Sequence, residues 1–268
     1  MIVPLATTLT LALLAQAPAD PDGPVVRLEM MKDAAGSYEI RMADGRARPF
    51  RLQAEPVLRF TNTVGATRDG AIFLWLDEGD RPAVAAQVFV KRDGSWTHEF
   101  TSLSPGPVVG KTPGAPDWRP TRAGVEFKPV PDAPKPADTP EQRLRQMQEL
   151  AREFAAEDLF REKSWQPLRL LTRPFARYGK PGGEVLDGAL FAYVLTTDPE
   201  VYLMLEARAG KDGPEWQFAF APMTIYSVRA SWKGREVWEL PTRWQTASHP
   251  VEPFYFRENV AAFGRRKP

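Results

Sequence analysis

The fold of this chain is decided by a stretch that occurs twice in similar form. Asp69-Gly70-Ala71-Ile72-Phe73-Leu74-Trp75-Leu76 is matched by Asp187-Gly188-Ala189-Leu190-Phe191-Ala192-Tyr193-Val194. Each copy begins with an Asp-Gly pair, which is typical of a turn, and continues as an unbroken apolar run, which is typical of a β-strand buried on both faces. We therefore expect one such strand in each half of the chain.

The similarity extends to both sides of these stretches in one register. Residues 56–60 resemble 167–171 upstream, and a Trp-x-x-x-Phe spacing downstream occurs at 96–100 and again at 216–220. The similar regions cover 56–131 and 167–241, two units of roughly 75 residues. A solenoid needs about three or more shorter units, so we interpret the pattern as a duplicated β-rich unit. The alternative is that turns and apolar strands match by chance.

The composition excludes several kinds of site. The 268 residues include no cysteine, so disulfides, thiolate metal sites and cysteine nucleophiles are absent. The formal net charge of +1 gives no electrostatic reason to expect nucleic acid or a membrane surface as a partner. The 27 prolines favour many turns and sheet edges over a helical bundle.

The first residues have the pattern of an export signal. Residues 1–19 contain no charged side chain, and the apolar run 3–14 is shorter than the roughly 20 residues that span a bilayer. Ala17-Pro18-Ala19 offers small residues for a signal peptidase, which predicts cleavage before Asp20. We expect an exported protein, periplasmic or extracellular, without a membrane span after cleavage; the alternative is an uncleaved anchor.

Strands and loops are predicted between the signal and the first unit, and between the two units. Alternating or continuous apolar patterns predict strands at 25–31, 38–43 and 50–54, with an Asp44-Gly45 hairpin joining the last two. Ten prolines between 105 and 140 predict a loop with one short strand at 125–130. The aromatic cluster Phe254-Tyr255-Phe256 is expected to hold the tail against the body.

One amphipathic helix is predicted over about 140–160. Thr139 is a suitable N-cap, Pro140 suits the first turn, and Gln142 completes a capping box. Apolar residues recur at helical spacing on one side, so we expect the helix to cover one face of the sheet.

Together these patterns predict an α+β, β-rich fold: two related antiparallel β-meander repeats with one covering amphipathic helix. The expected segments are a signal peptide at 1–19, an N-terminal half at 20–131, a proline-rich linker and helix at 132–166, and a C-terminal half at 167–268. Whether the halves form one composite domain or two is open at this stage.

The sequence lacks the standard catalytic motifs for nucleotide binding, serine hydrolysis and zinc hydrolysis. There are two histidines. His98 shares a strand face with Trp96 and Phe100 and is expected to be buried, with Glu99 on the opposite face, and His249 falls in a loop. We expect no metal, no cofactor and no catalytic residue.

Carboxylates and tryptophans are the remaining candidates. Asp69 and Asp187 are the symmetric carboxylate pair that a hydrolase would need, but each is expected to bond to its own turn backbone. Asp77, Glu78 and Glu206 occur once, without an evident partner. Four tryptophans lie near loops or strand ends and are the ligand-binding candidates: Trp118, Trp165, Trp232 and Trp244.

Three stretches carry a family resemblance: Pro140-Glu141-Gln142-Arg143-Leu144-Arg145-Gln146-Met147, Asp187-Gly188-Ala189-Leu190-Phe191-Ala192 and Asp198-Pro199-Glu200-Val201. They resemble an uncharacterised family of predicted exported bacterial proteins with no known function. The resemblance implies export and assigns no site residue.

Three functions remain open. The first is an exported, non-catalytic protein that binds another protein or an envelope component, in line with the missing catalytic motifs. The second is a glycan or small-molecule binding module that uses the four tryptophans. The third is a carboxylate-dependent hydrolase.

Overall fold

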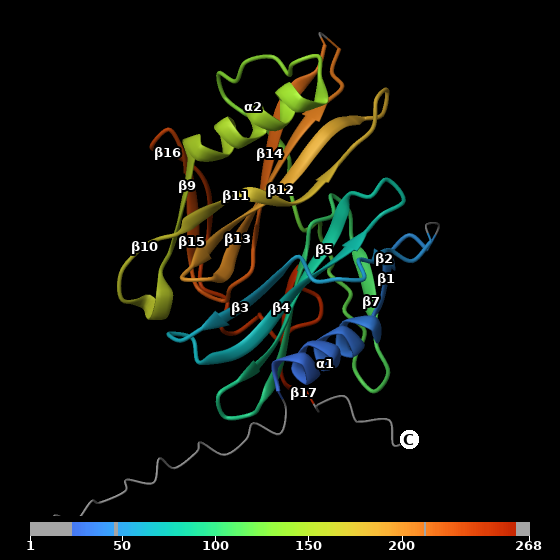
Figure 1. Ribbon diagram of the computed structural model, residues 1–268, viewed down its shortest axis with the longest axis vertical. Helices are drawn as coiled ribbons and strands as arrows, with labels where there is room; N and C mark the ends of the chain where they lie inside the picture. The colour runs from blue at the N-terminus through green and yellow to red at the C-terminus, as the bar shows by residue number, and fades with distance from the viewer. Residues whose placement is uncertain (1–22, 46–47, 212, 261–268) are drawn as a thin grey trace, which may run out of the picture.

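The computed structural model describes residues 23–45, 48–211 and 213–260, so the predicted signal peptide at 1–19 lies outside the described residues. Two antiparallel β-sheets pack face to face, and each has one helix on its outer face (Figure 1). The predicted α+β, β-rich class is confirmed, but two helices rather than one cover the sheets.

The first sheet has the strand order β17-β6-β5-β4-β2, with β3 also paired to β4. Helix α1 (Pro24–Gly36) packs on it through the buried residues Met31, Ala34 and Ala35. The strands of this sheet are β2 (Arg51–Leu52), β3 (Leu58–Asn62), β4 (Thr67–Leu76), β5 (Pro82–Lys91), β6 (Trp96–Ser102) and β17 (Phe254–Val260).

The second sheet has the strand order β11-β12-β13-β14-β8. Helix α2 (Pro140–Glu153) packs on its outer face through Met147, Leu150 and Ala151. Its strands are β8 (Lys128–Pro129), β11 (Arg169–Tyr178), β12 (Val185–Leu195), β13 (Asp198–Arg208) and β14 (Glu215–Pro222).

Two smaller sheets complete the described part of the chain. One pairs β1 (Glu39–Met42) with β7 (Val108–Lys111). The other has the order β10-β9-β15-β16, and the short helix η1 (Phe160–Glu162) follows β9. Its strands are β9 (Phe154–Asp158), β10 (Gln166–Pro167), β15 (Val228–Trp232) and β16 (Arg235–Leu240).

The apolar runs of the two quoted stretches form β4 and β12, and both strands are buried on both faces as predicted. Ile72 and Leu74 face the second sheet and contribute to one core with Leu190 and Tyr202. Phe73 faces the opposite way, into the core beneath α1. We call the core between the sheets the inter-sheet core.

The Asp-Gly pairs are not turns, contrary to the sequence interpretation, because Gly70 lies inside β4 and Gly188 inside β12. A neighbouring ring requires glycine at both positions. An added Cβ would lie 2.5 Å from the ring of Phe60 at Gly70 and 2.5 Å from the ring of Tyr178 at Gly188. Because real Cβ contacts are far longer, only glycine allows these rings to cross the strand.

Asp69 binds two arginines instead of its own backbone. Arg59 forms a two-point contact with it at 2.8 and 2.6 Å, and Arg27 of α1 donates to it at 2.7 Å. Arg59 also donates to the Pro24 carbonyl at 2.6 Å. Burial alone would raise the pKa of Asp69, but the hydrogen bonds from Arg59 and Arg27 outweigh it, so this pKa lies below its usual value.

The second half contains the same arrangement around Asp187. Arg177 contacts it at 2.9 and 2.7 Å, and Arg143 of α2 donates to it at 3.1 Å. Arg177 also donates to the Pro140 carbonyl at 2.5 Å. In both halves, one buried carboxylate therefore fixes the first turn of the helix to the sheet. We call these two groups the arginine clamps.

The two halves exchange their last strands. β8 follows the first meander in sequence but pairs with β14 of the second sheet. β17 follows the second meander but pairs with β6 of the first sheet. The predicted boundaries at 131 and 167 thus do not separate two complete sheets.

Two local predictions were wrong and a third was only partly correct, because tertiary packing overrides local pattern. Residues 25–31 belong to helix α1 and not to a strand, since Pro24 starts a helix whose buried residues follow helical spacing. The strands on either side of Asp44-Gly45 do not pair with each other as a hairpin, because β1 pairs with β7 and β2 pairs with β4. The strand expected at 125–130 is reduced to β8.

The Thr139 cap is confirmed, since its hydroxyl accepts the Gln142 N–H at 3.3 Å. The helix ends earlier than predicted, at Glu153, because Phe154 turns into β9 and its ring packs 4.6 Å from that of Trp232. Neither helix within the described residues is long and apolar enough to cross a membrane.

We predict that Asp187→Asn lowers the free energy of unfolding by about 3 kcal/mol, because it leaves two poorly solvated arginines without their counter-charge. Asp69→Asn should have a similar effect. Urea denaturation followed by circular dichroism would measure both. Asp80→Asn, which loses an ion pair between highly exposed side chains, is the control and should cost less than about 1 kcal/mol. Equal effects of Asp187→Asn and Asp80→Asn would contradict a stabilising role for the clamps.

Candidate functional site

Two cavities lie at opposite ends of the inter-sheet core. One, of about 410 Å³, is lined at the start of β4 and the start of β13. The other, of about 470 Å³, lies at the end of β4 and the start of β12. We call the first the acidic pocket, after Glu99, Asp198 and Glu200. We call the second the arginine pocket, after Arg81 and Arg208.

The three carboxyl groups that name the acidic pocket come from two strands, and a fourth, Asp158, is buried beside them without lining the pocket. Glu99 lies in β6 of the first sheet, whereas Asp198 and Glu200 begin β13 of the second. Asp158, at the end of β9, is fully buried and interacts electrostatically with both Asp198 and Glu200. The packing of the two sheets thus gathers four acidic side chains that are far apart in sequence.

Two amides of the first sheet fix the start of β13. Asn62 donates to Asp198 Oδ2 at 2.9 Å, and its own carbonyl oxygen is held by the N–H groups of Val64 and Gly65 at 3.0 and 2.8 Å. Gln87 donates to the Pro199 carbonyl at 2.7 Å. These bonds cross the inter-sheet core, so the position of Asp198 is set by the other sheet.

Several buried carboxylate oxygens receive no hydrogen bond from the described residues: both oxygens of Asp158 and Oδ1 of Asp198. The Glu200 carboxyl is within hydrogen-bonding reach of Asp158. Two ionised carboxylates are both acceptors, so this contact becomes a hydrogen bond only when one of them carries a proton. The site therefore contains buried carboxylate oxygens that can accept further hydrogen bonds. A buried oxygen without a hydrogen bond lowers the stability of the folded protein.

This environment raises the pKa of all four carboxyl groups. Burial is the main cause in each case, and it raises the pKa of Asp158 and of Asp198 to about 7. Repulsion from Asp198 raises the pKa of Asp158 further. Burial and the neighbouring carboxyl groups raise the pKa of Glu200 and Glu99 well above the usual value. Near neutral pH the cluster therefore holds protons that free carboxylates would have lost.

Aromatic rings form another wall of the acidic pocket. Trp244 packs edge-on against Tyr226, with ring centroids 5.3 Å apart, and Tyr226 packs in the same way against Phe160 at 5.0 Å. The Trp244 side chain is 56% exposed. The pocket thus combines an accessible ring face with buried acceptors.

The cations near the acidic pocket bond to other groups, although the buried Nε of Arg243 has no partner among the described residues and the Arg243 charge acts on Asp158. Lys91 pairs with Glu258, and Arg161 donates to the Val64 carbonyl at 3.1 Å. Arg243 donates to the carbonyls of Thr224 and Pro241. None of these contacts supplies a donor to Asp158 or to Asp198 Oδ1.

The four predicted ligand-binding tryptophans are in different environments. Trp118 is buried and donates to the Glu252 carbonyl at 2.8 Å, and Trp232 is buried with its ring against that of Phe154. Trp165 is half-buried, with the Arg229 guanidinium 4.2 Å from its ring centroid. Of the four, Trp244 is the one that lines the acidic pocket.

The other candidates do not form a catalytic group. Asp69 and Asp187 are held in separate arginine clamps. His98 is buried as predicted and contacts the Tyr38 hydroxyl at 2.8 Å, while Glu99 on the opposite face lines the acidic pocket. Burial and the nearby Arg257 charge lower the pKa of His98 to about 3. His249 is exposed in a loop, and no three acidic or histidine side chains in the described part of the chain are arranged to hold a metal ion.

The sequence did not identify Asp158, Asp198, Glu200 or Glu99 as site residues. Asp198 and Glu200 gave a weak signal, because they interrupt the apolar pattern at the start of a strand that is otherwise buried. Their proximity to Asp158 and Glu99 depends on strand pairing and sheet packing, which the sequence alone did not provide.

No protein-family model, curated protein or solved structure matches this chain. The resemblance to a family of exported bacterial proteins therefore stays a prediction. The acidic pocket must be interpreted from its own chemistry.

We predict that Asp198→Asn becomes progressively more stable relative to the wild type as pH rises from about 4 to 7. A carboxyl whose pKa is raised on folding, here to about 7, stabilises the folded protein at low pH and loses that contribution as pH rises through this range. At about 1.4 kcal/mol per pKa unit, the difference should reach up to about 4 kcal/mol.

Urea denaturation of both proteins between pH 4 and 8 would measure this difference. His98 acts in the opposite direction, because its lowered pKa makes its contribution grow with pH, but it is present in both proteins and cancels. A difference that stays flat between pH 4 and 7 would mean that Asp198 ionises normally.

Proposed function

We propose that this protein is a non-catalytic binding protein whose acidic pocket holds a hydroxyl-rich ligand, such as an oligosaccharide of the cell envelope. The proposal rests on one observation. The buried Oδ1 of Asp198, a residue that lines the pocket, lacks a hydrogen-bond donor, and the same pocket is lined by the exposed ring of Trp244.

The chemistry of the pocket complements a sugar. Sugar hydroxyls donate to carboxylates and accept from protonated carboxyls, and a cluster with raised pKa values offers both near neutral pH. The apolar C–H face of a sugar ring packs on a flat aromatic ring such as Trp244. A volume of about 410 Å³ is in the usual range of ligand pockets.

Export is part of the proposal and rests on the pattern of residues 1–19 and on the family resemblance. A periplasmic or extracellular location would bring the pocket into contact with envelope glycans.

We also infer that the chain is an internal duplication that extends beyond the stretches found in the sequence. The support is that the clamps at Asp69 and Asp187 repeat the same contacts, including an arginine bond to the carbonyl of the proline that starts each helix. The strand order and the exchange of β8 and β17 follow the same pattern in both halves. In this interpretation the two pockets occupy equivalent positions in the duplicated fold, but one is lined by carboxyl groups and the other by arginines.

We predict that Trp244→Ala weakens sugar binding by about tenfold or more, equivalent to about 1.4 kcal/mol. The assay is a thermal-shift screen with neutral oligosaccharides and soluble peptidoglycan fragments, followed by calorimetric titration of any hit. Trp165→Ala, which changes a tryptophan outside the pocket, is the matched control and should bind like the wild type. No hit with the folded wild-type protein, or equal weakening in both variants, would reject the proposal.

A carboxylate-dependent hydrolase is the second candidate, and the raised pKa values of Asp158 and Asp198 are the observation that favours it. A carboxyl that stays protonated near neutral pH can act as the general acid in glycoside cleavage, while a second carboxylate assists the attack. We predict that, if this candidate is correct, the protein releases reducing ends from a bound oligosaccharide and Asp198→Asn abolishes the release while binding persists. Binding of the oligosaccharide without release of reducing ends would reject the hydrolase candidate and leave the binding function as the supported one.

A further inference from the structure

The acidic pocket is lined by more carboxyl groups than cations. Behind its lining, Asp158 and Arg243 add one group of each sign, so they leave this excess unchanged. Lys91 pairs with Glu258, and Arg161 donates to the Val64 carbonyl at 3.1 Å. The other carboxyl groups of the lining form no ion pair with a described residue. The ionisable side chains of the lining are Lys91, Arg161, Glu99, Asp198, Glu200 and Glu258.

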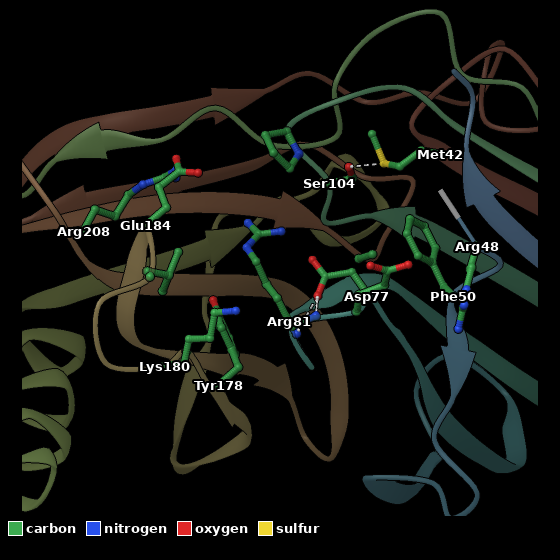
Figure 2. A pocket seen from close by; sticks show the side chains of 17 residues that line it. Met42, Arg48, Phe50, Asp77, Arg81, Ser104, Tyr178, Lys180, Glu184 and Arg208 are labelled. Carbon is green, nitrogen blue, oxygen red and sulfur yellow. Dashed lines mark hydrogen bonds and ion pairs between the residues drawn. The ribbon is translucent and has the colours of Figure 1, made fainter. Parts of the chain in front are cut away.

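The arginine pocket has no such excess of either sign. Arg81 and Arg208 both contact the buried Glu206, at 2.7 and 3.2 Å. Figure 2 shows the Arg81 side chain between the Arg208–Glu184 pair on one side and Asp77 on the other. The cations at this pocket, Arg48, Arg81, Lys180 and Arg208, are matched by Asp77, Glu78, Glu184 and Glu206.

Two carboxyl groups of the acidic pocket are placed to accept hydrogen bonds from a ligand. Asp198 is 9% exposed; its Oδ2 accepts from Asn62 at 2.9 Å, whereas its buried Oδ1 has no donor among the described residues. The nearby Gln87 amide donates to the Pro199 carbonyl instead. Glu99 lines the same pocket from β6, and no hydrogen bond from the described residues reaches its carboxyl group. A donor in the pocket would therefore meet one acceptor from each sheet.

These acceptors suit an ammonium group, because a carboxylate binds it with charge-assisted hydrogen bonds. Burial raises the pKa of Asp198 to about 7, and burial together with repulsion from Asp198 raises the pKa of Glu99 well above its usual value. A bound cation opposes both effects, since it supplies the missing counter-charge. No three acidic or histidine side chains in the described ranges are arranged to hold a metal ion, whereas an ammonium group needs only acceptors within hydrogen-bonding reach.

We propose that the acidic pocket binds a sugar that carries a primary ammonium group, with this group at Asp198 Oδ1 and Glu99 and the sugar ring on Trp244. This inference rests on the proposed sugar-binding function and adds the chemical class of the sugar. An unacetylated amino sugar fits, because it joins an ammonium group to a ring with an apolar face. N-acetylation removes the charge and with it the reason for tight binding at the carboxyl groups.

The test is calorimetric titration of the full-length protein with cellobiose, the glucosamine dimer of the same linkage and the N-acetylated form of that dimer. At about pH 6 a primary amine is protonated. The glucosamine dimer should therefore bind about tenfold or more tightly than cellobiose, and the N-acetylated form should lack this gain. Glu99→Gln should remove most of the preference. Glu149→Gln, which changes an exposed glutamate of α2 outside the pocket, is the matched control and should keep it.

A gain of affinity is an outcome that a misfolded variant cannot produce. Lys91→Gln removes a cation that acts on Glu99 and that pairs with Glu258. Binding of the glucosamine dimer should therefore tighten a few-fold. Lys111→Gln, which removes a lysine outside the pocket, is the matched control and should have no effect.

The outcomes separate this inference from the sugar-binding function on which it rests. Equal affinity for the three disaccharides would overturn the ammonium site and leave a neutral-sugar site, whereas no binding of any of them would reject both. An unchanged preference in both Glu99→Gln and Lys91→Gln would also overturn the ammonium site. Saturable calcium binding that Glu99→Gln abolishes would assign the carboxyl groups to a metal ion instead.

Discussion

The architecture depends on one constraint: the central strands of both sheets are apolar on both faces. A strand of this kind is stable only when each face is covered. In β4 and β12 one face meets the other sheet, and the other face meets a helix. Helix, sheet, sheet and helix therefore stack in that order, and the two helices are as necessary as the contact between the sheets. The arginine clamps fix the helices in place, since each joins the first turn of a helix to the strand beneath it.

The neighbouring groups, rather than the residue type, decide whether a buried carboxyl group in this protein has its charge compensated. Asp187 is buried but contacts two arginines, so its charge is compensated. Asp158 is equally buried and has no donor among the described residues, so the neutral form is favoured. Glu206 shows a third case, in which one carboxylate is shared by two guanidinium groups. The first and third arrangements hold buried charges against each other, whereas the second leaves unused hydrogen-bonding capacity at the edge of the inter-sheet core, where a ligand can use it.

Much of the fold was predictable, because it follows from local patterns. The buried strands around Ile72 and Leu190 and the Thr139 cap are encoded within a few residues. The errors occurred where a distant partner decides the outcome. Gly70 was interpreted as a turn residue, but the ring that requires it belongs to Phe60 on the neighbouring strand. A helical pattern continued past Glu153, but the chain leaves the helix there to pair with β15.

The candidate site was predictable only in part. Trp244 was one of four tryptophans that sequence position alone did not distinguish, and the packing of the sheets separates it from the buried Trp118 and Trp232. The carboxyl groups of Asp158 and Asp198 were missed because they are close together only in the folded state. Glu206 had no evident partner in the sequence, since Arg81 lies on the other sheet.

The exchange of β8 and β17 has a consequence for the order of folding during synthesis. The edge of the first sheet along β6 is paired by residues 254–260, which are separated from β6 by residues 103–253. At typical translation rates this segment takes on the order of ten seconds to be made, so the nascent first sheet must wait that long with an open edge. An unpaired edge recruits strands from other chains. A chain built in this way is best kept unfolded, or bound by a chaperone, until its final strand has emerged.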